Sequence, residues 1–233
     1  MRPKFKLVVF DLDGTLVDCE SSWVFVHRHF GLDNDASLEL YLRGEIDDEE
    51  FMRSDIALWK GRKPDITIKD VENILLGIGI YPGARKLFSL LKGAGIRTAI
   101  VSGGLMPLAR RVAFELEIDH VLANGLAVDK GGRLLGYGLL EVELNRKGLP
   151  MERLMKRLGI DRDKVAAVGN SSIDAPMLEL AGLGIAFNPI DEEVTEIADV
   201  LVEGSDLMAL APYLIPETHA RPKGGRRRNR RGR

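Results

Sequence analysis

The stretch KFKLVVFDLDGTLVD, residues 4–18, decides the fold of this chain. Its apolar run Leu7–Phe10 is uninterrupted, which is typical of a strand buried on both faces of a parallel sheet. Asp11 and Asp13 follow directly, and side chains two residues apart in an extended segment point the same way. We therefore expect two carboxylates to converge at the carboxyl end of a central strand, where open α/β sheets bind their ligands.

Strand and helix patterns alternate from residue 81 onward. Strands are expected over residues 97–102, 120–123, 164–169, 184–187 and 200–202, with a hairpin over 126–142 around the turn signal at 129–132. Helices are expected over 84–94, 105–117, 147–158, 174–181, 192–198 and 206–213. This alternation predicts an α/β fold with a doubly wound, mostly parallel sheet covered by helices on both faces.

Residues 18–80 interrupt that alternation with four amphipathic helical patterns. The patterns cover 20–30, 35–42, 47–59 and 67–76, and glycine-containing stretches separate them. The sequence therefore predicts a core of residues 1–17 and 81–215, an inserted all-helical cap of residues 18–80 and a tail of residues 216–233. The tail is rich in Pro, Gly and Arg, and we expect it to be disordered.

Composition limits the class of protein. Of the 233 residues, 45% are hydrophobic and 29% are charged, as in an ordinary globular protein. No apolar segment approaches the ~20 residues that cross a bilayer, so no membrane partner is expected. The single cysteine cannot form an internal disulfide, which fits a cytoplasmic location. Eight of the 33 basic residues lie within residues 221–233, so an acidic body carries a basic tail whose charge suits weak binding of a polyanion.

Polar groups follow the expected strands in four places, in the order DLDGT (11–15), SGG (102–104), Lys147 and GNSSID (169–174). In this order they resemble the motifs of the haloacid dehalogenase (HAD) superfamily of aspartate-nucleophile phosphotransferases, and most of all its phosphoserine phosphatase branch. The resemblance covers residues 4–213 and implies a Rossmann-like core with a helical cap. It also implies Mg²⁺-dependent hydrolysis of a small phosphorylated metabolite, with phosphoserine as one candidate, through an aspartyl-phosphate.

The chemistry of the individual residues suits this activity. The Asp11 carboxylate is the candidate nucleophile, because its attack on phosphorus splits one difficult step into two. Asp13 is placed to protonate the leaving oxygen and then to deprotonate the attacking water. Ser102 offers a hydroxyl and Gly103 a backbone N–H to the phosphate, while Lys147 adds a positive charge near the phosphate and Asp11.

A phosphate beside several carboxylates needs a hard cation, and Mg²⁺ fits. The resemblance implies that Asp11, the backbone carbonyl of Asp13 and the first polar residue of the fourth motif bind it. That residue is Asn170 here, where the family usually has Asp, so we expect weaker metal affinity. Asp174 is expected to hold a metal-bound water or Lys147, and it is also placed to cap a helix.

Substrate choice is expected to lie in the cap. Glu20 stands where the family's cap glutamate faces the substrate amine. The family's cap arginine for the substrate carboxylate falls on Asp55 here, with Arg53 two residues earlier as a substitute. This departure leaves the substrate open. Two alternatives also stay open, namely phosphoryl transfer to a second alcohol and a weakened HAD scaffold that binds polyanions through residues 221–233. The oligomeric state is open too.

Overall fold

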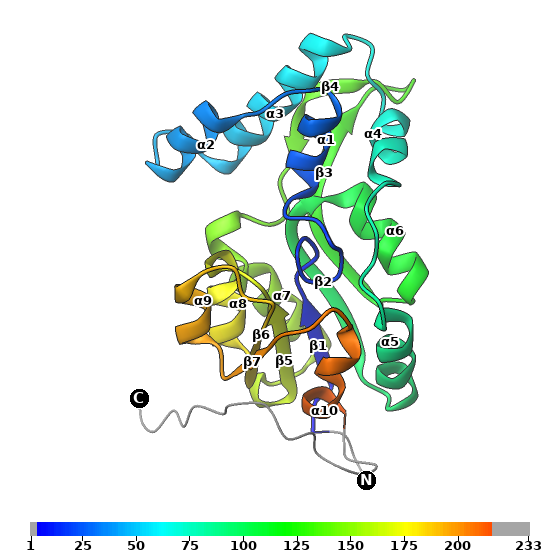
Figure 1. Cartoon of the computed structure of the whole chain (residues 1–233), viewed down its shortest axis with the longest axis vertical. Helices are drawn as coiled ribbons and strands as arrows, with labels where there is room; N and C mark the ends of the chain where they lie inside the picture. Colours follow the sequence, from blue (N-terminus) through cyan, green and yellow to red (C-terminus); the bar gives the residue numbers. More distant parts are fainter. Residues whose placement is uncertain (1–3, 216–233) are drawn as a thin grey trace.

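The computed structural model describes residues 4–215 (Figure 1). Over that range, seven strands form one sheet in the order β4-β3-β2-β1-β5-β6-β7, and all neighbours are parallel except β3 and β4. The strands are β1 (Leu7–Phe10), β2 (Arg97–Leu105), β3 (His120–Val128), β4 (Leu134–Leu139), β5 (Val165–Gly169), β6 (Leu183–Phe187) and β7 (Val200–Val202). The core helices are α5 (Ala84–Gly93), α6 (Met106–Leu116), α7 (Gly148–Leu158), α8 (Ala175–Leu180), α9 (Glu192–Ile197) and α10 (Ala211–Leu214).

The central strand is β1, which pairs with β2 on one side and with β5 on the other. All four of its residues are buried. Val8 and Phe10 belong to a hydrophobic cluster with α5 and α6, whereas Leu7 and Val9 belong to a second cluster with α7, α8 and α9. Figure 1 shows these two groups of helices on opposite faces of the sheet. The prediction of a doubly wound parallel core is therefore confirmed.

Four helices form the cap, which stands above the core in Figure 1. Asp47 and Thr67 begin the third and fourth of them with a capping box, in which the cap side chain and the third helical residue each accept the other's backbone N–H. The prediction of an inserted helical cap is confirmed. Its helices are α1 (Ser22–His29), α2 (Asp35–Leu42), α3 (Asp48–Arg62) and α4 (Ile68–Leu75).

The hairpin of β3 and β4 differs from the prediction, which had a short strand over residues 120–123 and a separate hairpin over residues 126–142. β3 is continuous, because it pairs with β2 along its first part and with β4 along its last. β4 in turn packs on α3. A Cβ at Gly138 of β4 would lie 2.7 Å from Met52 Sδ of α3. In addition, Lys60 Nζ of α3 donates a hydrogen bond to the Leu134 carbonyl of β4 at 2.7 Å. The hairpin, which the predicted boundaries assign to the core, thus contacts the cap directly.

The C-terminal part of the described chain also differs in detail. The helix expected over 206–213 is a 3₁₀ turn followed by α10. Residues 216–233, with their predicted disorder and polyanion binding, lie outside the described residues. Within residues 4–215, no helix is long and apolar enough to cross a membrane. The 3₁₀ turns are Leu144–Arg146, Arg162–Lys164, Ser172–Asp174 and Leu207–Leu210.

Two chain segments, around residues 17 and 80, connect the core to the cap. Asp18 N donates to the Gly79 carbonyl at 3.1 Å, and Tyr81 N donates to the Leu16 carbonyl at 3.0 Å. The outgoing and the returning segments are therefore paired with one another, and any motion of the cap must bend both together.

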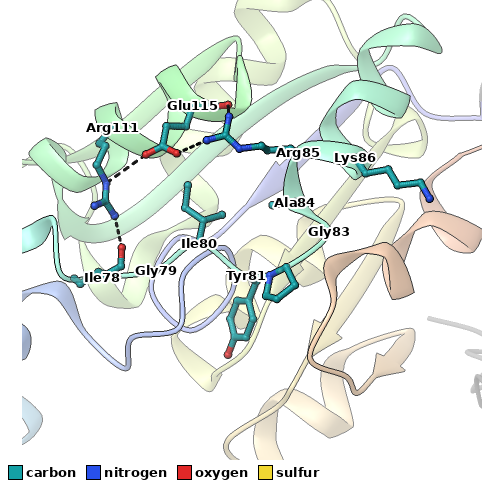
Figure 2. Close-up of a pocket in the computed structure, with 11 residues that line it drawn as sticks. Ile78, Gly79, Ile80, Tyr81, Gly83, Ala84, Arg85, Lys86, Arg111 and Glu115 are labelled. Carbon is teal, nitrogen blue, oxygen red and sulfur yellow. Dashed lines mark hydrogen bonds and ion pairs between the residues drawn. The ribbon is translucent and has the colours of Figure 1, made fainter.

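Arg111 of α6 holds the returning segment from the core side (Figure 2). Its guanidinium donates to the Ile78 carbonyl and lies beside Glu115, which also accepts a hydrogen bond from Arg85. These groups line a pocket of about 580 Å³. Arg111 thus connects the core helix α6 to the hinge of the cap.

We expect Arg111→Leu to lower the free energy of unfolding by about 1 kcal/mol, because the Ile78 carbonyl loses a charged donor. The loss is moderate because the Arg111 Nε, which is buried and has no hydrogen-bond partner within residues 4–215, is removed as well. Urea denaturation measures the difference. The matched control is Arg110→Leu, at the exposed neighbouring position of α6, which should stay within about 0.5 kcal/mol of wild type. Equal values for the two variants would contradict the role of Arg111.

Candidate active site

Asp11 and Asp13 lie just beyond β1 and line a cavity of about 510 Å³. The loops after β1 and β5, the last residues of β2 and Lys147 form its floor, and residues of α1, α2, α3 and their connections form its walls. Of the predicted site residues, Arg53 and Asp174 are not part of the cavity lining. The predicted residues that line it are Asp11, Asp13, Glu20, Ser102, Gly103, Lys147 and Asn170.

Lys147 lies at the buried centre of the site, where a 3₁₀ turn passes into α7. Its Nζ donates to Asp11 Oδ1 at 2.8 Å and to Asp174 Oδ1 at 2.7 Å. All three side chains are at most 5% exposed. Burial alone would lower the pKa of Lys147, but the charges of Asp11 and Asp174 raise it above its ordinary value. The ammonium is therefore a fixed cation in the floor of the cavity.

Asp11 is not fully compensated by that cation. Burial raises the pKa of Asp11, the charge of Asp174 raises it further, and Lys147 opposes both effects. A second positive charge at the site would favour the ionised form of Asp11, which is the form that a carboxylate nucleophile needs.

Asp13 is held by the first residue of α1. Its Oδ2 accepts hydrogen bonds from the Ser22 N and Oγ, both at 2.8 Å. Its Oδ1 is buried and has no hydrogen-bond partner within residues 4–215. Burial raises the pKa of Asp13 to about 6, and the bonds from Ser22 oppose the rise. A carboxyl group with such a pKa and one unused oxygen is suited to proton transfer near neutral pH.

The last residues of β2 pack closely against the loop after β1. A Cβ at Gly104 would lie 2.6 Å from Asp13 Oδ2 and 2.9 Å from Ser22 Oγ, so only glycine fits there. Ser102 Oγ accepts a hydrogen bond from Gly104 N at 3.1 Å, which leaves its hydroxyl proton for another acceptor. Ser22 Oγ also accepts from Leu105 N at 2.9 Å. The cap, the loop after β1, and β2 are thus joined at Ser22.

The fourth motif brings Asp174 behind Lys147. Asp174 Oδ2 accepts from the backbone N–H groups of Asn170 and Ser171 at 2.9 and 3.2 Å, while Oδ1 accepts from Lys147. Both oxygens are therefore engaged by protein groups, and the predicted contact with Lys147 is present. The Asn170 carboxamide lies against the loop after β1, where a Cβ at Gly14 would come within 2.3 Å of its Nδ2.

The donor set fits a hard cation of modest affinity. Asp11, the Asp13 carbonyl and Asn170 offer oxygen atoms of the kind that Mg²⁺ prefers, and the unpartnered Asp13 Oδ1 adds negative charge nearby. The negative charge that these donors provide is low, however. Within residues 4–215, no group of three or more His, Cys, Asp or Glu side chains is placed to hold a metal ion. The weaker affinity expected from Asn170 stays a prediction.

The cap residues predicted to bind substrate differ in their placement. Glu20 reaches the cavity and accepts from Arg28 Nη2 at 3.0 Å. Arg53 is exposed on α3, because the buried positions of that helix include Met52 and Asp55 and their neighbours one turn on. Helical spacing therefore places Arg53 off this buried face, and the geometry does not support its predicted contact with substrate.

Asp55 lines the cavity instead and is only 4% exposed. Its Oδ1 accepts from His27 Nε2 at 2.7 Å and also from Asn34 Nδ2. Trp59 Nε1 donates to the other ring nitrogen of His27, Nδ1, at 3.1 Å. These four side chains of the cap form a polar network in which Asn34 is half-buried and the other three are buried, and all of them except Trp59 line the cavity.

Ser22 and Asn124 position the site but were not among the predicted residues. Asn124 Nδ2 donates to the carbonyls of Gly103 and Val142 at 3.2 and 2.9 Å. The sequence does carry a signal for each. Ser22 lies at the start of a helical pattern, where serine is favoured, and Asn124 is a polar residue within an apolar strand.

We expect Lys147→Met to cost about 3–5 kcal/mol of unfolding free energy near pH 8, because two buried carboxylates lose their counter-charge. The pKa of Asp11, already raised by burial, rises further above its value in the unfolded chain, so the native state binds more protons as the pH falls. The deficit is therefore smaller near about pH 5 than near about pH 8. Urea denaturation in the presence of a chelator measures both values.

The matched control for this prediction is Lys156→Met, an exposed position on the same helix, which should change the stability by less than about 0.5 kcal/mol. A deficit for Lys147→Met that does not depend on pH would mean that the two carboxylates are not the groups left unpaired.

Comparison with known proteins places these observations in a family. The model of the haloacid dehalogenase-like hydrolases matches residues 8–179. The phosphoserine phosphatase of Archaeoglobus fulgidus is 33% identical over 214 residues, which make up 90% of this chain and 60% of that protein. The phosphoserine phosphatase of Methanocaldococcus jannaschii is 33% identical over 219 residues, 92% of this chain and 100% of that protein.

The solved structures agree with the sequence comparisons. A structure of a phospho-aspartyl intermediate analogue of phosphoserine phosphatase matches with a TM-score of 0.76 and 31% identity, covering 91% of this chain and 99% of that chain. The resemblance inferred from the four motifs is confirmed. The chain belongs to the haloacid dehalogenase-like hydrolases, on the phosphoserine phosphatase-like branch of the superfamily.

Proposed function

We propose that this protein is a phosphatase that hydrolyses the phosphomonoester of a small alcohol through a phosphoryl group carried on Asp11. The observation that carries the proposal is the buried 2.8 Å contact between Lys147 and Asp11 in the floor of a cavity that the cap covers. A fixed cation beside a carboxylate can hold the phosphate and stabilise the charge that develops during transfer. The names of the relatives support this reaction class.

The proposed reaction has two steps. In the first, the Asp11 carboxylate attacks phosphorus, the bond from phosphorus to the alcohol oxygen breaks, and Asp13 gives a proton to that oxygen. In the second, Asp13 takes a proton from water as the water oxygen attacks the aspartyl-phosphate, which releases phosphate and restores Asp11. The proton belongs on Asp13 Oδ1, because Ser22 already donates two hydrogen bonds to Oδ2.

Ser102 and Gly103 are proposed to hold the other phosphate oxygens together with Lys147. The charge of a transferring phosphoryl group spreads over three oxygens, so several donors are needed at once. The peptide of Gly103 is held in orientation, since its carbonyl accepts from Trp23 Nε1 at 3.1 Å and from Asn124 Nδ2 at 3.2 Å. The hydroxyl proton of Ser102 is unused by the backbone, as described above.

HAD phosphatases generally use Mg²⁺, and we propose that Asp11, the Asp13 carbonyl and Asn170 hold it here. When bound, the ion supplies positive charge that neutralises the phosphate oxygens and the carboxylates beside them. Asp174 is proposed to act through its contacts, by orienting Lys147 and the backbone of the fourth motif. The names of the relatives make phosphoserine the first metabolite to assay.

Release of phosphate from a generic aryl phosphate tests the mechanism. Wild type should release phosphate with Mg²⁺ and stop when a chelator is added. Asp11→Asn should lose at least about 10³-fold in rate, because the nucleophile is removed. The matched control, Asp161→Asn, changes an exposed carboxylate at the amino end of β5 and should keep the wild-type rate. Release that survives Asp11→Asn would overturn the proposal.

The affinity for Mg²⁺ tests the role of Asn170 without recourse to activity. We expect Asn170→Asp to bind Mg²⁺ about tenfold more tightly than wild type, because the site gains a carboxylate ligand. Thermal unfolding across a Mg²⁺ titration measures this affinity. The matched control is Asn73→Asp, an exposed position of α4 outside the cavity lining. Equal affinities for wild type and Asn170→Asp would place the ion away from Asn170.

A further inference from the structure

The walls that the cap contributes to the active-site cavity are acidic. Apart from Asp11 and Asp13, five carboxylates line the cavity, and the basic side chains that line it are Arg28 and Lys147. Lys147 is committed to Asp11 and Asp174, and Arg28 to Glu20. The cap therefore offers any substrate an acidic surface. The five carboxylates are Glu20, Asp33, Asp35, Asp48 and Asp55.

Asp55 is the buried member of this group, and the structure gives it no compensating charge. Within residues 4–215, its one ion-pair partner is His27. The indole N–H of Trp59 can only donate, so His27 Nδ1 accepts that bond and carries no proton. His27 is therefore neutral, and its single ring proton, on Nε2, points to Asp55. A buried carboxylate held by neutral donors attracts a cation.

The hydrogen bonds leave Asp55 one oxygen for a ligand. The donors described within residues 4–215, His27 Nε2 and Asn34 Nδ2, both reach Oδ1. Oδ2 accepts none of these bonds, and Asp55 lines the cavity. The aromatic side chains of Trp23 and Phe51 also line the cavity, and aromatic faces are favourable neighbours of an ammonium group.

A carboxylate on the substrate has no comparable partner. Arg53, the predicted substitute for a carboxylate-binding arginine, lies on the exposed face of α3 outside the cavity lining. Arg28 is tied to Glu20, and both side chains are 67% exposed to solvent. A substrate carboxylate near Asp55 would face negative charge without a cation held in place, which disfavours binding.

From this arrangement we propose that the preferred substrate is the phosphate ester of an amino alcohol without a carboxylate, whose ammonium group binds Asp55. The inference rests on the proposed phosphatase activity and specifies its substrate class. The phosphate would lie in the floor with Asp11 and Lys147, and the ammonium against the wall at Asp55. Asp55 is thus a specificity-determining residue, separate from the residues that perform the chemistry.

Three small esters that differ mainly in charge test the proposal, namely phosphoethanolamine, ethyl phosphate and phosphoglycolate. For wild type with Mg²⁺, kcat/KM should be highest for phosphoethanolamine and lowest for phosphoglycolate, by about tenfold or more between the two. Phosphoserine, which carries both charges, should fall below phosphoethanolamine. A longer amine, 3-aminopropyl phosphate, is assayed as well, because its chain spans a greater distance between the phosphate in the floor and the ammonium at the wall.

Asp55→Asn tests the residue itself, since it keeps the oxygen that accepts from His27 and Asn34 but removes the charge. The ratio of kcat/KM for phosphoethanolamine to that for phosphoglycolate should fall by about tenfold. The matched control is Glu49→Gln, which removes an exposed carboxylate on the same helix outside the cavity lining and should keep the wild-type ratio. An unchanged ratio in Asp55→Asn would overturn the role of Asp55.

The outcomes separate this inference from the proposed function. Turnover that favours phosphoglycolate or phosphoserine over both amines overturns the inference while the phosphatase stands, and Arg28→Gln would then show whether Arg28 binds the carboxylate. Absence of turnover with every ester and with the aryl phosphate counts against the proposed function. Calorimetric titration of the same esters into Asp11→Asn with Mg²⁺ decides the inference even then, since the amines should bind more tightly than phosphoglycolate.

Discussion

The buried ammonium of Lys147 is the interaction on which the site depends. Lys147 lies 136 residues from Asp11 and 27 residues from Asp174 along the chain, and the three segments meet only in the folded core. None of these charges is stable alone in an apolar interior, so each needs the other two in place. The same contact therefore orients the Asp11 carboxylate and requires that β1, the connection after β4 and the loop after β5 be correctly assembled.

The sequence was most informative where one local pattern determined the environment. β1 was predicted with its observed ends, because a short unbroken apolar run that ends in polar and turn residues is typical of a strand covered on both faces. Asp11 and Asp13 followed from their position at the end of that strand. Lys147 was found only through the order of the motifs, since a lysine at a helix start has no distinctive local pattern.

Features that depend on distant contacts escaped prediction. The continuity of β3 is set by its pairing with two different strands, and the Asn124–Gly125 pair within it resembles a turn. Arg53 was chosen by its nearness in sequence to a family position. The spacing of Met52, Asp55, Ile56 and Trp59 on one helix face would have excluded it. The neutral state of His27 requires the indole of Trp59, 32 residues away.

The packing of β4 on α3 bears on how such a cap could be exchanged between related proteins. A segment cut at residues 18–80 would leave the hairpin behind, and with it the surface that covers Met52 and the carbonyl that accepts from Lys60. The transplanted helices would expose an apolar face and leave the half-buried Lys60 ammonium without its carbonyl acceptor. The cap and the hairpin, two pieces of chain more than forty residues apart, would therefore have to be exchanged together.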